Sequence, residues 1–224
     1  MKRIIIAAVI VCVGFGVSYA KSYKVDFEAK LGNEWTLEGD AGTSTEQKHG
    51  GTKSLKIVPM SVVSYIISEK NVFGTVTMYA YDGGENPKSP KKYNFGGRWG
   101  LIDADESKLV FGMIFAEWVN GNSNYNWGSS AASTSHGGWE FADRYYTNFK
   151  RSKGWHKWAF EFSGKDDLMV YMDDEAVKPD CFKMETAQFG SGFTGLYFLG
   201  GDKRGGSEIL EAPVYIDDIT IQTK

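Results

Sequence analysis

Apolar side chains alternate with polar or aromatic ones, at a period of two, along most of the chain. Val76, Met78 and Ala80 form one such series. The same alternation runs through residues 157–162, and residues 109–118, 168–172 and 214–221 form further strand-like runs, of which 109–118 carries Val110, Ile114 and Trp118 on its opposite face. This period is typical of half-buried strands in antiparallel sheets. No helical period follows residue 20, so the pattern predicts strands almost throughout.

Glycine pairs separate these segments and mark the expected turns, among them Gly50-Gly51, Gly96-Gly97, Gly137-Gly138 and Gly200-Gly201. Many short, evenly spaced strands without helices predict an all-β fold, a two-sheet antiparallel jelly-roll β-sandwich. The sequence shows no internal repeat and no interdomain linker. We therefore expect residues 21–224 to form a single domain.

The N-terminus has the three parts of a signal peptide. Lys2 and Arg3 are followed by the apolar stretch Ile4 to Val17, and Ser18-Tyr19-Ala20 then offers small residues for cleavage. The stretch is shorter than the roughly 20 residues that cross a bilayer. We expect residues 1–20 to be removed and the mature chain to be secreted, periplasmic or on the cell surface, without membrane contact. The alternative is an uncleaved membrane anchor.

Charge and cysteine content narrow the possible partners of the mature chain. Without Lys2 and Arg3 the 25 basic side chains become 23, against 28 acidic ones. The charges are mixed and form no basic block, which argues against nucleic-acid binding. Cys181 would be the sole cysteine after cleavage, so no intramolecular disulfide can form. The fold must then be held by its core or by a bound metal.

Two neighbouring segments form a recognisable pattern, Gly154-Trp155-His156-Lys157-Trp158-Ala159-Phe160 and the strand from Leu168 to Val177. They resemble the concanavalin A-like (laminin G-like) lectin and glucanase superfamily and its carbohydrate-binding-module relatives, although Asp174 replaces a common turn glycine. Val25–Glu28, His49–Ile57 and Val214–Ile221 resemble the opening and closing strands of such modules. The resemblance implies a β-sandwich. Because the superfamily includes lectins, adhesion domains, glycosidases and lyases, it does not select one function.

An acidic pair interrupts the alternation of the last strand. Val214 and Ile216 share one parity, whereas Ile219 and Ile221 share the other, so a bulge at Asp217-Asp218 is expected. In related binding modules a structural calcium ion often joins the first and last strands. By that resemblance Glu28 and Asp217 are the candidate ligands, since calcium takes oxygen ligands. The alternative is a solvated acidic turn.

The longest segment without a clear period is Asn120 to Tyr146, which is expected to be a functional loop. It is rich in Asn, Ser and Gly yet contains aromatic rings, and such rings stack on the C–H faces of sugars. The candidate carbohydrate-binding residues are Trp118, Tyr125, Trp127, Trp139 and Tyr146, with Arg98 and Glu117 as polar partners. For each ring the alternative is core packing. Trp35, Trp155 and Trp158 are assigned to structure.

Signs of catalysis are weak in this sequence. The Glu-x-Asp-x-x-Glu pattern, which would place paired carboxylates on one strand face, is absent. A lyase could use a histidine or tyrosine base with an arginine, roles in which His136, Tyr146 and Arg98 can be cast. We therefore expect an exported domain that binds a polysaccharide or glycan. A polysaccharide lyase or glycoside hydrolase and a protein-binding adhesion module are the alternatives.

Overall fold

The computed structural model describes residues 20–84, 93–103, 108–117, 124–133, 138–164, 167–177, 192–201, 208–209 and 211–224. Side chains at 93–95, 108–111, 113, 115–117, 126–133, 138–146 and 208 lie outside this description. Residues 1–19 of the expected signal peptide, the loop at Pro87–Lys92, Trp118, His136 and Cys181 also lie outside it. The described residues form strands and turns, and none lies in a helix able to cross a membrane.

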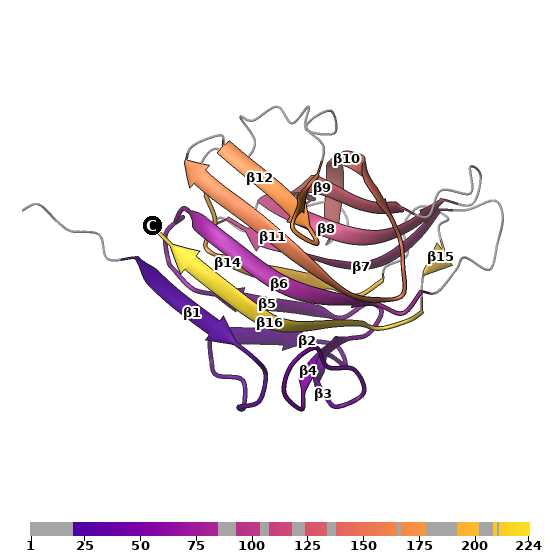
Figure 1. Ribbon diagram of the computed structural model, residues 1–224, viewed down its shortest axis with the longest axis horizontal. Coiled ribbons are helices and arrows are strands. Elements are labelled where there is room, and N and C mark those ends of the chain that lie inside the picture. The colour runs from indigo at the N-terminus through magenta and orange to yellow at the C-terminus, as the bar shows by residue number, and fades with distance from the viewer. Residues whose placement is uncertain are drawn as a thin grey trace, which may run out of the picture.

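Two sheets face each other in the described part of the chain (Figure 1). Sheet A follows the order β13-β12-β11-β6-β16-β4-β3, and β1 also pairs with β16. Its strands are β1 (Lys21–Val25), β3 (Gly42–Ser44), β4 (Ser54–Ile57), β6 (Gly74–Asp82), β11 (Gly154–Gly164), β12 (Asp167–Met172), β13 (Glu175–Ala176) and β16 (Val214–Thr223). All of these pairings are antiparallel.

Sheet B follows the order β10-β9-β8-β7-β14-β5-β2, with β15 pairing to β7. Its strands are β2 (Trp35–Glu38), β5 (Val62–Ile66), β7 (Tyr93–Ile102), β8 (Lys108–Glu117), β9 (Asn124–Ser133), β10 (Gly138–Lys150), β14 (Gly195–Leu199) and β15 (Glu208–Ile209). Only the short β15 contact is parallel among the described pairings. The all-β jelly-roll sandwich expected from the alternation is confirmed.

The core lies between the sheets and follows the period of two. In β6, Val76, Met78 and Ala80 are buried, and their neighbours in the strand are half-buried. Trp158 of β11 meets Trp99 of β7 edge to face, with ring centroids 5.3 Å apart. Burying large rings from both layers supplies the main hydrophobic stabilisation of such a fold. The assignment of Trp35 and Trp158 to the core is confirmed.

Gly112 of β8 lets the two tryptophans come together. A β-carbon at this position would lie 2.7 Å from both the Trp158 ring and Trp99 Nε1. No side chain fits in that space, because real β-carbons essentially never approach so closely. The glycine is therefore required by packing between the layers.

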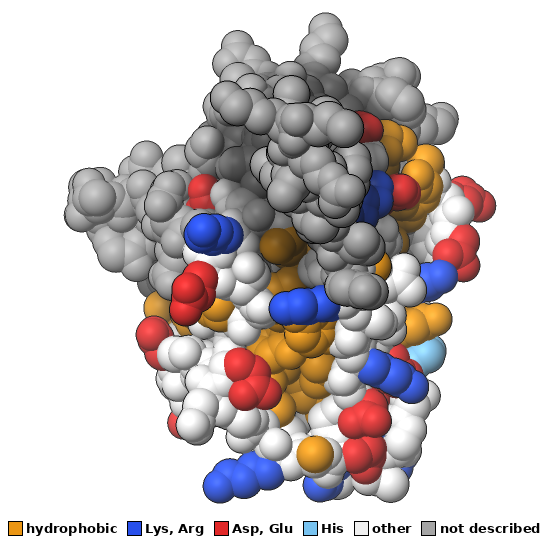
Figure 2. All heavy atoms as spheres, turned by 90° about the vertical axis from the view of Figure 1, so that its left-hand side faces the viewer, with side chains coloured by type: hydrophobic (Ala, Val, Ile, Leu, Met, Phe, Trp, Pro, Cys, Tyr) orange, Lys and Arg blue, Asp and Glu red, His pale blue; other side chains and the backbone are white. Residues whose placement is uncertain are grey.

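The core reaches the surface at the end of the sandwich where β1 begins and β16 ends. Ile67, Val72, Phe73 and Leu168 are half-buried and pack against it. Figure 2 views this end and shows apolar side chains between polar and charged ones. Partial exposure of apolar atoms is common on folded proteins.

The region 120–146 is not a long loop, and that prediction is wrong. Its described residues form β9 and most of β10, which pair with each other in an antiparallel hairpin, and β9 also pairs with β8. Strand propensity depends on context, so neighbouring strands can hold Asn-, Ser- and Gly-rich sequence in a sheet. The segment therefore widens sheet B instead of forming a loop beside it.

Two local features noted in the sequence, the bulge expected at Asp217-Asp218 and the replaced turn glycine at Asp174, can be compared with the structure. The register between β16 and β6 shifts between Asp217 and Thr220, which confirms the bulge at the acidic pair. The turn between β12 and β13 has two residues with positive φ, 49° at Asp173 and 66° at Asp174. This is the type I′ hairpin geometry, so the turn keeps its shape although Asp174 replaces the preferred glycine.

Candidate functional site

The outer face of sheet A carries aromatic side chains in a row across three adjacent strands. Trp155 of β11 pairs with Tyr81 of β6, and Tyr81 pairs with Tyr215 of β16. The ring centroids are 5.4 Å apart for Tyr81–Trp155 and 6.0 Å apart for Tyr81–Tyr215, both edge to face. We call these three residues the aromatic ladder. It lies outside the core because Val76, Met78 and Ala80 turn the other face of β6 inward.

His49 and Tyr79 extend the aromatic ladder by one row. Tyr79 lies two residues before Tyr81 and therefore on the same face of β6. The His49 imidazole stacks on the Tyr79 ring, with centroids 3.5 Å apart and planes 16° apart. It also meets Trp155 edge to face at 5.8 Å. Five rings thus form one continuous surface.

The rings differ in how much of them solvent can reach. Tyr79, Tyr81 and Trp155 are half-buried. Tyr215 is only 6 % exposed, and its hydroxyl donates to Glu46 Oε2 at 2.6 Å. Burial and this hydrogen bond raise the pKa of Tyr215. Tyr215 therefore supports the row and His49 covers one face of Tyr79, while Tyr81 and Trp155 can offer ring faces to a ligand.

Charged side chains border the rings. Lys157 of β11 lies opposite Tyr79 of β6 in the sheet. Its Nζ donates to Asp174 Oδ1 at 2.6 Å. The Asp174 carboxylate raises the pKa of Lys157. Lys56 contacts Glu46 at 2.5 Å beyond Tyr215. Apolar ring faces with ammonium and carboxylate groups at the rim can both stack on a sugar and hydrogen-bond its hydroxyls.

The bulged aspartate Asp217 joins the last strand to the segment His49–Lys53. It is 0 % exposed, and its Oδ2 accepts the backbone N–H groups of His49 at 2.9 Å and Gly50 at 3.1 Å. Its Oδ1 accepts the N–H of Asp218 at 2.8 Å. Burial raises the pKa of Asp217, and these hydrogen bonds act against the rise.

Glu28 holds the other end of the same segment. Its Oε1 accepts the N–H groups of Thr52 at 2.5 Å and Lys53 at 2.9 Å, and its Oε2 accepts the Thr52 hydroxyl at 2.6 Å. These bonds, the Thr52 hydroxyl first, lower the pKa of Glu28 to about 2. We call the segment His49–Lys53 with Glu28 and Asp217 the carboxylate clamp.

The carboxylate clamp does not fit a calcium ion as it is arranged. Calcium takes six to eight oxygen ligands, whereas each carboxylate oxygen of Glu28 and Asp217 already accepts a hydrogen bond. Lys53 Nζ also lies 3.0 Å from the Glu28 carbonyl oxygen, which places a cation there already. Within the described ranges no three His, Cys, Asp or Glu side chains group as metal ligands. Calcium binding, which the sequence led us to expect, stays untested, and the clamp joins the strands by hydrogen bonds without requiring an ion.

The sequence led us to expect Tyr125 at the surface, stacking on a ligand, but its ring is buried in the core. It is 1 % exposed, and its ring packs edge to face on Trp158 at 5.8 Å. Its hydroxyl donates to the Ser152 carbonyl oxygen at 3.1 Å, and burial raises its pKa. Strand β9 turns this ring into the core, so core packing, the alternative stated for each ring, holds here. Arg98 is also buried, at 1 % exposed.

Four of the other predicted binding residues lie in strands, with side chains outside the described part, and Trp118 lies outside it altogether. Trp127 pairs with Gly112 and Tyr145, Trp139 with Ala132, Tyr146 with Asn126, and Glu117 with Tyr93. Trp139 is six residues from Tyr145 along β10, which is roughly 20 Å of strand. Trp127 and Trp139 therefore lie far apart on the sheet. Whether they border one groove stays a prediction.

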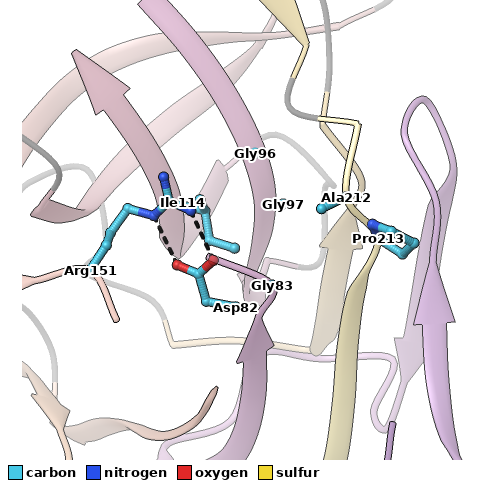
Figure 3. Close-up of a pocket in the computed structure, with 8 residues that line it drawn as sticks. All are labelled: Asp82, Gly83, Gly96, Gly97, Ile114, Arg151, Ala212 and Pro213. Carbon is cyan, nitrogen blue, oxygen red and sulfur yellow. Dashed lines mark hydrogen bonds and ion pairs between the residues drawn. The ribbon is translucent and has the colours of Figure 1, made fainter. Parts of the chain in front are cut away.

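A small pocket lies between the sheets, beside a buried ion pair (Figure 3). Glycines of β7 form part of its wall. Arg151 Nε and Nη2 donate to the two oxygens of Asp82, each at 2.8 Å. Because Asp82 already neutralises the guanidinium, Arg151 is poorly placed to neutralise a uronate. This pocket gives no support to lyase chemistry.

The sequence analysis missed the aromatic ladder because Trp155 was assigned to structure. The alternation within β6 could have revealed it. Tyr79 and Tyr81 occupy the positions of β6 that alternate with the core series, where a solvated face would carry polar residues. Aromatic residues at solvent-facing parity in adjacent strands mark such a surface.

No protein-family model and no curated protein matches this chain. Solved structures do match it, and three of them share 10–11 % sequence identity with this chain. BuGH16Bwt has a TM-score of 0.54, with 91 % of this chain and 93 % of that chain covered. An endo-1,3-beta-glucanase from Streptomyces sioyaensis has a TM-score of 0.51, with 97 % and 99 % covered. An endo-beta-1,4-glucuronan lyase from Trichoderma reesei also reaches 0.51, with 90 % and 95 % covered. The chain shares their jelly-roll fold.

Proposed function

We propose that this chain binds carbohydrate through the aromatic ladder and the His49–Tyr79 stack on the outer face of sheet A. The observation that carries the proposal is the row of half-buried rings with charged groups at its rim. Rings in fixed edge-to-face contacts lose little freedom when a sugar stacks on them, which favours binding. Each stacked sugar is expected to contribute on the order of 1 kcal/mol, so binding is weak and grows with chain length.

Solved structures of the same fold support a carbohydrate partner. They include a 1,3-beta-glucanase, a beta-1,4-glucuronan lyase and a beta-agarase in complex with oligoagarose, the last with a TM-score of 0.50. Fold alone does not carry an activity. These proteins do suggest which polysaccharides to try first.

We also propose that residues 1–20 direct export and are then removed, so that the partner is an extracellular glycan. The motivation is the sequence of the N-terminus. Intact-mass measurement of the exported protein tests this, with a mature chain beginning at Lys21 as the expected result. A chain that keeps its N-terminus and stays with the membrane would contradict export by cleavage.

Affinity electrophoresis with residues 21–224 tests the proposed function. Gels would contain 1,3-beta-glucan, beta-1,4-glucuronan or agarose, and reducing-sugar and unsaturated-product assays would run in parallel. The proposal expects slower migration in at least one gel without product formation. Tyr23→Ala serves as a control, because this ring packs against the core on β1, away from the aromatic ladder. Normal migration in all gels contradicts binding to these glycans, and product formation favours an enzyme.

A further inference from the structure

Ser152, His156 and Asp173 form a chain of hydrogen-bonded side chains, two of them from neighbouring turns and His156 from β11. Ser152 Oγ lies 3.0 Å from His156 Nε2, and His156 Nδ1 lies 2.8 Å from Asp173 Oδ2. A serine hydroxyl on one imidazole nitrogen and a carboxylate on the other is the order that activates a serine nucleophile. We propose that Ser152, His156 and Asp173 hydrolyse short-chain carboxylic esters, an activity separate from carbohydrate binding.

The fold fixes the carboxylate end of this line. Asp173 lies in the type I′ turn after β12, opposite the start of β11. Its Oδ1 accepts the Lys157 N–H at 2.9 Å, and its own N–H donates to the Lys157 carbonyl oxygen at 2.8 Å. These two bonds leave Oδ2 facing His156 Nδ1. The carboxylate can accept only, so it holds a proton on Nδ1 and leaves Nε2 of a neutral imidazole as an acceptor.

His156 is held in place while Ser152 is accessible. The Tyr125 ring packs edge to face on the imidazole at 5.3 Å, and only 13 % of the His156 side chain is exposed. Ser152 is exposed, in the turn between β10 and β11. A nucleophile that solvent can reach, beside an imidazole fixed by packing, is the arrangement that substrate attack requires.

The His156 imidazole makes a second contact, which bears on its role as a general base. His156 Nε2 also lies 3.1 Å from the Ser152 carbonyl oxygen. A neutral imidazole with its proton on Nδ1 can accept from the Ser152 hydroxyl but cannot donate to that carbonyl. Once Nε2 gains a proton, it can donate to the carbonyl oxygen, and this contact stabilises the imidazolium. The two contacts therefore suit the two states of a general base.

The proposed reaction balances without a cofactor. Ser152 Oγ attacks the ester carbonyl carbon while His156 Nε2 takes the hydroxyl proton. The carbon–oxygen bond to the alcohol then breaks, and His156 returns the proton to the departing alkoxide, leaving an acyl-serine. Water, deprotonated by His156, attacks the acyl group and releases the carboxylic acid and the free serine. Lys153 follows Ser152 in the chain and is exposed, so its ammonium group is available to the negative charge that develops on the carbonyl oxygen.

Labelling and turnover with residues 21–224 test the proposal. A fluorophosphonate probe followed by peptide mass spectrometry should modify Ser152. With p-nitrophenyl acetate, Ser152→Ala and His156→Asn should lower kcat/KM at least about a hundredfold, with Asp173→Asn intermediate. Circular dichroism melting of each variant shows that the fold is retained, and Ser152→Ala, at an exposed turn, is the variant least able to disturb it.

Ser163→Ala is the matched control. Ser163 is also exposed, and its hydroxyl also bonds to a carboxylate, that of Asp167, but its described contacts include no histidine. This variant should keep full turnover and labelling. The proposal is overturned if Ser152 is not labelled, or if Ser152→Ala hydrolyses the ester as fast as the parent. Neither result depends on whether a glycan binds the aromatic ladder.

Discussion

At the scale of single residues, Met60 stands in a backbone conformation that glycine prefers. It follows Pro59 in a turn closed by the Ser61 N–H donating to the Val58 carbonyl oxygen at 3.2 Å, and its φ is 65°. This is the third position of a type II turn, where a β-carbon is strained. The Met60 side chain is 62 % exposed, so its removal exposes little new apolar surface.

We predict that Met60→Gly raises the free energy of unfolding by about 0.5–1 kcal/mol, because relief of strain exceeds the added entropy of the unfolded chain. Urea unfolding measures the change. Met60→Ala is the control, since alanine keeps the β-carbon and should bring no gain. A Met60→Gly protein less stable than Met60→Ala would show that the methionine side chain makes a stabilising contact.

The lowered pKa of Glu28 in the carboxylate clamp leads us to predict that the stability of the protein depends on pH. Its pKa in the folded protein is about 2, below its value in the unfolded chain. The ionised carboxylate therefore stabilises the fold fully above about pH 4.5, and this contribution is lost as the pH falls toward 2. Glu28→Gln should lower the melting temperature at pH 7 and converge with the parent near pH 2. Thr52→Val removes the largest cause of the lowered Glu28 pKa, so in that background Glu28→Gln should change the pH dependence of the melting temperature less. A Glu28→Gln protein that melts below the parent by the same amount at every pH would contradict the prediction.

The burial of Trp158 allows us to predict how much free energy of unfolding is lost with a core ring. It is 0 % exposed and packs on both Trp99 and Tyr125. Trp158→Ala should lower the free energy of unfolding by roughly 3–5 kcal/mol through lost burial and a residual cavity. Chemical unfolding checks the value. A cost below about 1 kcal/mol would mean that the two layers can close over the missing ring.

At the scale of elements, the sequence predicted strands well where the two faces differ in polarity. The alternation of β6 and the parity break in β16 gave the strand and the bulge that the structure has. The hairpin of β9 and β10 was missed because Asn-Gly-Ser composition is typical of loops, whereas the pairing that holds it comes from β8, whose register no local pattern reveals.

The carboxylate clamp gives an element-scale prediction about metal removal. Because Glu28 and Asp217 already accept hydrogen bonds from the segment His49–Lys53, the first and last strands are joined without an ion. We expect the melting curve of the mature chain to be unchanged by a chelator. Asp217→Ala should lower the melting temperature in either condition, since it leaves buried N–H groups without acceptors. A melting temperature that falls in chelator and recovers with calcium would support calcium binding instead.

At the scale of the whole molecule, the sequence predicted the sandwich but not the surface that we propose for binding. Period-two alternation reports which residues are buried between layers, and this sufficed for the fold. A binding surface depends on which strands become neighbours. Tyr81, Trp155 and Tyr215 are far apart in the chain and meet only because β16 and β11 flank β6. Tyr125 failed as a ligand contact for the converse reason, since strand formation turned its ring into the core.

The most direct measurement of the central claim is the dissociation constant of Trp155→Ala for a polysaccharide that the parent protein binds. Loss of one stacking ring is expected to cost about 1 kcal/mol, which corresponds to roughly fivefold weaker binding, while Trp127→Ala binds like the parent. Isothermal titration at matched protein concentration gives both values. If Trp155→Ala binds as tightly as the parent and Trp127→Ala does not, the aromatic ladder is not the binding surface.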